Sequence, residues 1–181
     1  VDMSSDRSGP QILVTAKSEQ DHRAYVGNPN TPIQNVLSKI FVATKATIRK
    51  DGELLPVENL IASLDNSLRE IETDYIDVFQ FHAVPPNLYD HIREEYAPAF
   101  LREKEKGKIR HLGLTETPPN DPAGEMLVKA SVDPIWEVLM LGFHMMHQVA
   151  RRNCFPGTMK NRIGTTILFV VRSIFSLPGR L

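Results

Sequence analysis

Short apolar runs that alternate with amphipathic helical stretches are the feature that most constrains the fold of this chain. The runs begin near residues 40, 75, 109, 137 and 165. This spacing is close to the roughly 30 residues that one β-strand and its crossover helix require. Strands that alternate with helices form a parallel sheet covered by those helices. The sequence therefore predicts an α/β fold.

The predicted strands are short runs rich in β-branched and aromatic residues, as expected for a buried parallel sheet. They span residues 40–44, 75–81, 109–114, 137–143 and 165–171, and residues 12–15 are a further candidate. Between the first two strands, residues 57–71 carry apolar side chains at the i, i+3, i+4 and i+7 positions of a helix. Pro56, just before them, suits a helix start.

A second predicted helix covers residues 88–106 and ends at Gly107, a residue favoured just past a helix C-terminus. Pro98 lies inside this helix and lacks the backbone N–H that a helix interior needs. The sequence therefore predicts a kink or a break at Pro98. Shorter helices are predicted at residues 125–130 and 144–153.

Composition excludes several classes of protein. The 21 basic residues nearly balance the 22 acidic ones, whereas nucleic-acid-binding domains are normally strongly basic. The most apolar stretch, residues 163–177, contains Arg172 and is shorter than the ~20 uncharged residues of a membrane span. The first ten residues lack the apolar core of a signal peptide, and the single cysteine, Cys154, fits a reducing compartment. We therefore expect a cytoplasmic protein that binds neither nucleic acid nor membrane.

The common cofactor and hydrolase motifs are missing. The sequence contains no G-x-G-x-x-G dinucleotide fingerprint, no P-loop and no G-x-S-x-G nucleophile elbow. His144 and His147 lie three residues apart, but no H-E-x-x-H or C-x-x-C accompanies them, so we expect a packed or solvated histidine pair and no metal. Function must therefore be sought at the ends of the predicted strands.

Two predicted strands end in a titratable side chain. Lys45 follows residues 40–44, and His82 follows residues 75–81. In a parallel αβ barrel, side chains at the carboxyl ends of the strands line the catalytic mouth. Position alone also allows a simpler interpretation, in which Lys45 is a solvated strand terminus and His82 an ordinary hydrogen-bonded histidine.

Three sequence blocks resemble the aldo-keto reductase family. They read V-A-T-K at residues 42–45, S-L-D-N-S-L-R-E-I-E-T-D-Y-I-D-V-F-Q-F-H at 63–82 and G-K-I-R-H-L-G-L-T-E at 107–116. The resemblance implies a (β/α)8 barrel of the TIM type, with about five or six of the eight βα units present in this chain. It also implies reduction of aldehydes or ketones with NADPH or NADH as cofactor. Lys45 and His82 fall on the family's catalytic lysine and histidine.

The resemblance gives each residue a chemical role. Hydride reaches the carbonyl carbon, and the developing oxyanion takes a proton from a tyrosine. A phenol has a pKa of about 10, so a neighbouring ammonium, here Lys45, is needed to lower that pKa. The histidine, here His82, donates a hydrogen bond that orients the carbonyl and helps to stabilise the oxyanion.

The chain departs from the family at the aspartate and the tyrosine that complete the site. In the nearest alignment, Val14 replaces the aspartate and Glu19 replaces the tyrosine. Tyr25, in Ala24-Tyr25-Val26-Gly27, is displaced from that alignment and is the candidate proton donor. Without an acid at this point, proton delivery loses a factor of about 10²–10⁴ in rate.

The positions that hold the nicotinamide in the family have also changed. The usual Ser-Asn pair corresponds to Thr115 and Glu116, and the usual glutamine corresponds to Met140. These three residues are the candidate cofactor-binding residues. Thr115 keeps a hydroxyl, Glu116 adds a charge, and Met140 has no amide to donate a hydrogen bond.

The sequence divides into a divergent segment and a partial barrel. Residues 1–39 are interpreted as a remnant of the first βα units, and residues 40–181 as a barrel that lacks its last strand and helix. The chain begins with valine, so we expect a piece of a longer gene product. An incomplete barrel has unpaired strand edges through which copies of the chain could associate.

Three functions stay open from the sequence. The leading prediction is an NADPH-dependent oxidoreductase acting on a small carbonyl substrate, with Lys45 and His82 as its surviving active-site residues. The alternative is a non-catalytic, truncated member of the family, a pseudoenzyme that acts through protein association. A third is a lyase of another αβ-barrel family, in which a desolvated Lys45 forms a Schiff base.

Overall fold

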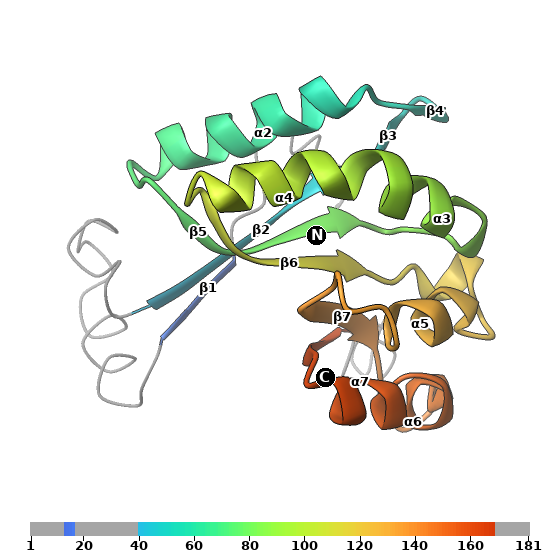
Figure 1. Ribbon diagram of the computed structural model, residues 1–181. Helices are drawn as coiled ribbons and strands as arrows, with labels where there is room; N and C mark the ends of the chain where they lie inside the picture. Colours follow the sequence, from blue (N-terminus) through green and yellow to red (C-terminus); the bar gives the residue numbers. More distant parts are fainter. Residues whose placement is uncertain (1–12, 17–39, 169–181) are drawn as a thin grey trace, which may run out of the picture.

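The computed structural model describes residues 13–16 and 40–168, and its centre is one curled, six-stranded sheet (Figure 1). The strand order is β1-β2-β5-β6-β7-β8. The strands are β1 Leu13–Ala16, β2 Ile40–Thr47, β5 Ile76–His82, β6 Ile109–Thr115, β7 Val138–Gly142 and β8 Gly164–Leu168. In this sheet, β2, β5, β6, β7 and β8 pair in parallel, and β1 pairs antiparallel with β2. The predicted parallel α/β sheet is confirmed as an incomplete barrel.

Helices cover the outer side of the sheet, where α2 and α4 lie side by side (Figure 1). The helices are α2 Val57–Glu70, α3 Tyr89–His91, α4 Ala97–Glu105, α5 Glu125–Ala130, α6 Val149–Asn153 and α7 Phe155–Asn161. Shorter elements are the 3₁₀ turns Pro86–Leu88 and Pro118–Asn120, the π-helical turn Ile92–Tyr96, and the hairpin strands β3 Arg49–Lys50 and β4 Glu53–Leu54. That hairpin was not predicted.

The hydrophobic core lies between the sheet and these outer helices. Phe79 and Phe81 of β5 pack on Phe100 of α4, with ring centroids 4.8 and 4.9 Å apart. Leu60 and Leu64 of α2 are fully buried on the same side. The helix faces that pack on the sheet are therefore the ones that the apolar periodicity of the sequence predicts to be buried.

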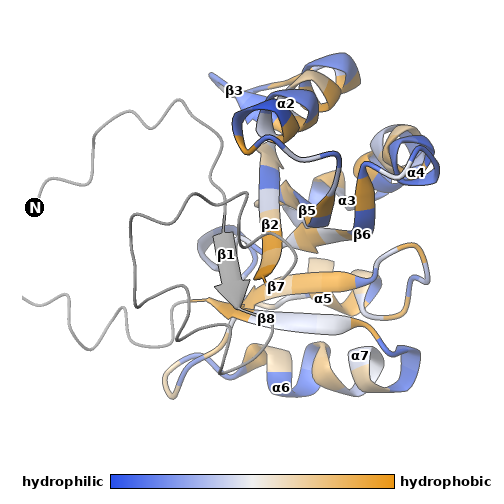
Figure 2. Ribbon diagram, turned by 90° about the vertical axis from the view of Figure 1, so that its left-hand side faces the viewer, coloured by the Kyte–Doolittle hydropathy of each residue, from blue (hydrophilic) through white to orange (hydrophobic). Residues whose placement is uncertain are grey.

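The opposite face of the sheet is concave and more open. Along β2, the side chains of Val42, Thr44 and Ala46 are buried, whereas Phe41 on the other face is 48% exposed. Strand residues alternate between the two faces of a sheet, so this difference separates the covered outer face from the concave one. In Figure 2, β7 is strongly hydrophobic and the edge strand β8 is pale, because β8 contains a glycine and two threonines.

A kink or a break was predicted at Pro98, and the structure instead places a π-helical turn just before it. A π-helical turn, Ile92–Tyr96, precedes α4, and Pro98 lies in the first turn of α4. Proline can start a helix but cannot donate the hydrogen bond of a helix interior. The stretch is therefore built as successive helical segments rather than as one regular helix.

The predicted helix at residues 144–153 is only partly right. Residues 144–147 form a tight turn, in which His144 and His147 exchange backbone hydrogen bonds of 3.1 and 2.9 Å. The helix α6 starts only at Val149, and α7, with Pro156 in its first turn, follows directly. The two backbone bonds of the turn hold residues 144–147 outside any helix. The predicted strand at 165–171 is seen from Gly164 to Leu168, and the rest lies outside the described residues.

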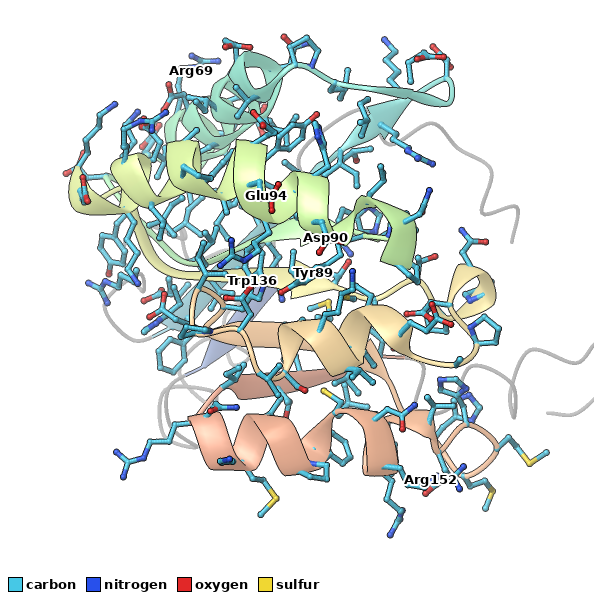
Figure 3. The ribbon with its side chains drawn as sticks, turned by 45° about the vertical axis from the view of Figure 1, so that its right-hand side comes forward. Arg69, Tyr89, Asp90, Glu94, Trp136 and Arg152 are labelled. Atoms are coloured by element: carbon cyan, nitrogen blue, oxygen red, sulfur yellow. The ribbon has the colours of Figure 1, made fainter. Side chains whose placement is uncertain are left out.

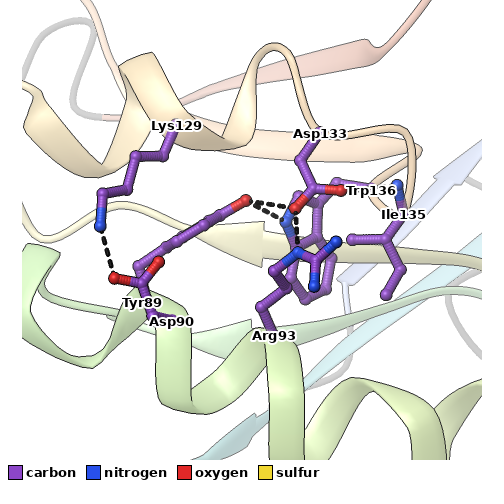
Figure 4. Close-up of polar contacts among 7 residues, drawn as sticks. All are labelled: Tyr89, Asp90, Arg93, Lys129, Asp133, Ile135 and Trp136. Atoms are coloured by element: carbon purple, nitrogen blue, oxygen red, sulfur yellow. Dashed lines mark hydrogen bonds and ion pairs between the residues drawn. The ribbon is translucent and has the colours of Figure 1, made fainter.

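A polar network joins α3 to the loop between α5 and β7 (Figure 4). Tyr89 donates a hydrogen bond of 2.8 Å to Asp133 and accepts one of 3.0 Å from the indole N–H of Trp136. Arg93 adds a 2.8 Å ion pair to Asp133. Figure 3 shows Tyr89 and Trp136 together in the interior, while Arg69 and Arg152 project outward. Because Tyr89 and Asp133 satisfy each other's hydrogen-bonding groups inside the protein, we interpret this network as structural.

No helix in the described part of the chain is long and apolar enough to cross a membrane.

Candidate active site

Lys45 and His82 lie on neighbouring parallel strands near their carboxyl ends. Lys45 of β2 pairs in register with Gln80 of β5, and Thr47 of β2 pairs with His82. Residues in register share a face of the sheet, as do residues two apart along a strand. Lys45 and His82 are therefore in successive layers on the same, concave face. Both side chains are half-buried.

The two side chains influence each other electrostatically. Burial lowers the pKa of Lys45, because it disfavours the ammonium. Burial also lowers the pKa of His82, and the positive charge of Lys45 lowers it further. Lys45 forms no ion pair with any residue that the structure describes. The Lys45 amine and the His82 imidazole are therefore both shifted toward their neutral forms.

Hydrogen bonds to β6 fix the end of β5 that carries His82. The backbone N–H of Ala83 donates to the Thr115 hydroxyl oxygen at 2.7 Å, and that of Val84 donates to the Thr115 carbonyl at 3.0 Å. Ala83 has a φ of 54°, a left-handed conformation that costs a non-glycine residue free energy. These two bonds hold Ala83 in that conformation and so set the direction in which the chain leaves His82.

The three residues predicted to bind the cofactor are close in the structure but buried. Thr115 pairs in register with Met140, and the backbone N–H of Glu116 donates to the Met140 carbonyl at 2.8 Å. The side chain of Glu116 is turned to β7, where its Oε2 accepts a 2.7 Å hydrogen bond from the backbone N–H of Gly142. Burial raises the pKa of Glu116 to about 7.

This set of residues does not fit the task of holding a nicotinamide amide. Thr115 keeps an O–H donor, but its oxygen already accepts a hydrogen bond from Ala83. One carboxyl oxygen of Glu116 is engaged by Gly142, and Met140 offers only a weak thioether acceptor. Tyr25, the predicted proton donor, lies outside the described residues, and the side chains of Val14 and Glu19 are not described either.

A second polar cluster, which the sequence did not predict, surrounds Gly142. A Cβ atom at Gly142 would lie 3.6 Å from Glu116 Oε2 and 3.6 Å from the His147 ring. The other carboxyl oxygen of Glu116 and the Nε2 of His147 are buried and have no hydrogen-bond partner among the residues that the structure describes. The only sequence signal for this cluster was an unexpected charge at position 116. In the described part of the chain, no three His, Cys, Asp or Glu residues are placed to hold a metal ion.

Comparison with proteins of known sequence identifies one family. A sequence model described as the aldo/keto reductase family matches residues 23–174. L-galactose dehydrogenase of Arabidopsis thaliana is 35% identical over 81 residues, which cover 45% of this chain and 25% of that protein. Aldo-keto reductase YhdN of Bacillus subtilis is 26% identical over 135 residues, or 72% of this chain and 38% of that protein. The matched part of the chain thus spans well under half of these relatives.

Solved structures show the same fold. The holo form of an aldo-keto reductase from Bacillus halodurans has a TM-score of 0.55 at 24% identity, over 75% of this chain and 44% of that one. An aldo/keto reductase from Klebsiella pneumoniae, in complex with NADP and acetate, has a TM-score of 0.52 at 16% identity, over 74% of this chain and 44% of that one. Since the family match covers most of the sequence and the half-barrel has the same architecture, this chain belongs to the aldo/keto reductase family.

Proposed function

We propose that this chain supplies the carbonyl-binding part of an NADPH- or NADH-dependent oxidoreductase that reduces aldehydes or ketones. The observation that supports this most directly is the placement of Lys45 and His82 in successive layers of one concave face. Both residues come from the sequence blocks that carry the family resemblance. Relatives named L-galactose dehydrogenase and methylglyoxal reductase agree with a substrate of this class.

In the proposed reaction, His82 donates a hydrogen bond to the substrate carbonyl, and its half-buried position strengthens that bond. The ammonium form of Lys45 stabilises the negative charge that grows on the carbonyl oxygen, and it lowers the pKa of a nearby phenol, for which we propose Tyr25. A nicotinamide cofactor would supply the hydride. Because Glu116 and Met140 do not fit its amide, no step is assigned to either residue.

The test is cofactor-dependent turnover by the chain itself. NADPH binding is followed by the fluorescence of the reduced nicotinamide, and NADPH oxidation is measured with a panel of small aldehydes and ketones. We expect saturable binding and turnover of at least one carbonyl. A folded sample that binds NADPH but reduces none of the panel would contradict the proposal.

A second candidate is a non-catalytic member of the family. It is favoured by the use of the Glu116 carboxyl in bonding to Gly142, in place of a side chain free to hold a cofactor. This candidate predicts no saturable NADPH binding in a sample that circular dichroism shows to be folded. Binding at micromolar cofactor would exclude it.

A further inference from the structure

Lys45 has an environment that sets it apart from the other described lysines. Four of them pair with carboxylates: Lys104 with Glu137, Lys106 with Glu103, Lys108 with Asp65 and Glu103, and Lys129 with Asp90. Lys50 and Lys160 are exposed to solvent. Only Lys45 is half-buried and yet has no ion pair with a described residue, so nothing described holds its amine in the charged form.

We propose that Lys45 is also a nucleophilic amine that forms an imine with small aldehydes, with His82 carrying the proton. This activity shares its two residues with the proposed function, but it needs no cofactor. It also does not depend on Glu116 and Met140, the residues that fail to fit a nicotinamide.

Access and basicity both favour this chemistry. The residues two positions before and after Lys45 on the same face are Ala43 and Thr47, so neither neighbour along β2 places a long side chain over the amine. Burial without an acidic partner among the described residues lowers the pKa of Lys45 and so favours the neutral amine, the form that attacks a carbonyl. The imidazole of His82, whose pKa is also lowered, is available as a base.

The reaction balances without an oxidant or reductant. The Lys45 nitrogen attacks the aldehyde carbon to give a carbinolamine, and His82 accepts the proton that the nitrogen loses. His82 transfers this proton to the former carbonyl oxygen, which becomes the carbinolamine hydroxyl, and then carries the second N–H proton to that hydroxyl, which leaves as water while the C=N bond forms. The products are one imine and one water molecule, and hydrolysis reverses the reaction.

Reductive trapping on the intact chain tests the inference. The chain is incubated with benzaldehyde and sodium cyanoborohydride near pH 7, and the alkylated lysines are identified by mass spectrometry of its peptides. Lys160, exposed on α7, is the internal control for ordinary amine reactivity. We expect Lys45 to be alkylated faster than Lys160, because Lys45 is half-buried beside His82, which carries the proton, whereas Lys160 is exposed on the helix surface. Alkylation of Lys45 at or below the rate of Lys160 would overturn the inference.

Two variants separate the roles of the residues. In Lys45→Arg, the fast alkylation should vanish while that of Lys160 is unchanged. In His82→Asn, alkylation of Lys45 should slow several-fold, and an unchanged rate would remove His82 from the mechanism. Because trapping uses no NADPH, failure of the imine activity is distinguishable from failure of carbonyl reduction. Either activity can be observed without the other.

Discussion

Glu116 is a buried carboxyl whose pKa is raised close to neutral pH. Its side chain is 4% exposed, and burial raises its pKa from an ordinary 4.5 to about 7. Asp121 and Cys154 are near enough to interact with it electrostatically, and neither can compensate a negative charge. At pH 6 the folded protein therefore keeps Glu116 mostly neutral, whereas the unfolded chain ionises it.

This difference predicts that the native state loses stability as pH rises from about 4.5 to about 7. Between these values the unfolded chain binds fewer protons, so the free energy of unfolding falls, by about 3 kcal/mol in total for Glu116. Glu116→Gln cannot ionise and keeps an oxygen for the Gly142 N–H. We expect Glu116→Gln to be more stable than wild type at pH 8 and about equal to it at pH 4.5 in urea unfolding. A stability difference that is the same at every pH would contradict this account.

At the level of secondary-structure elements, the network around Tyr89 connects α3 to the loop before β7. Tyr89→Phe removes the hydroxyl and leaves the buried indole N–H of Trp136 without its acceptor. Since an unpaired buried polar group costs ~1–3 kcal/mol, we expect a loss of that size in the free energy of unfolding. The control is Tyr75→Phe, because Tyr75 contacts Arg110 through its ring face, at 3.7 Å. Equal effects of the two substitutions would show that the hydroxyl of Tyr89 has no special role.

The long, strongly periodic elements could be predicted from sequence, and the short ones could not. Burial on one or both faces fixes the apolar pattern of β2, β5, β6 and α2, so their positions follow from composition and spacing. The hairpin of β3 and β4 and the helix α7 depend on local hydrogen bonds that leave little trace in hydrophobicity. The irregularity just before Pro98 was predictable only in outline, because proline disfavours a regular helix interior but does not determine the π-helical turn Ile92–Tyr96.

The candidate site also contains features that could be predicted from sequence and features that could not. That Lys45 and His82 share one face near the strand ends could be predicted, because strand ends in a parallel sheet have a defined direction, while their catalytic roles stay predictions that rest on the family resemblance. The orientation of Glu116 could not be predicted, because it depends on a hydrogen bond to Gly142, 26 residues further along the chain. The role of Tyr25 stays a prediction, since Tyr25 lies outside the described residues.

At the scale of the whole molecule, the half-barrel presents a strand edge at β8. Ile167 of β8 is 38% exposed, and β8 has β7 as its one partner in the described sheet. Unpaired edges with apolar side chains favour association between chains. We therefore expect the sedimentation coefficient of the purified chain to rise with concentration, and Ile167→Lys to reduce this rise.

The matched control is Val132→Lys, which places the same charge at a residue that is 62% exposed and lies outside the sheet. It should leave association unchanged. If both lysine substitutions reduced association equally, net charge and not the β8 edge would be responsible.

We propose that Lys45 and His82 form a carbonyl-directed site on the concave face. The decisive measurement is the kcat/KM for NADPH-dependent carbonyl reduction in Lys45→Met, compared with Lys50→Met, which removes an exposed lysine of β3. We predict that Lys45→Met lowers kcat/KM by about 10²–10⁴ without loss of folding, and that Lys50→Met leaves it unchanged. Wild-type activity in Lys45→Met would contradict the claim.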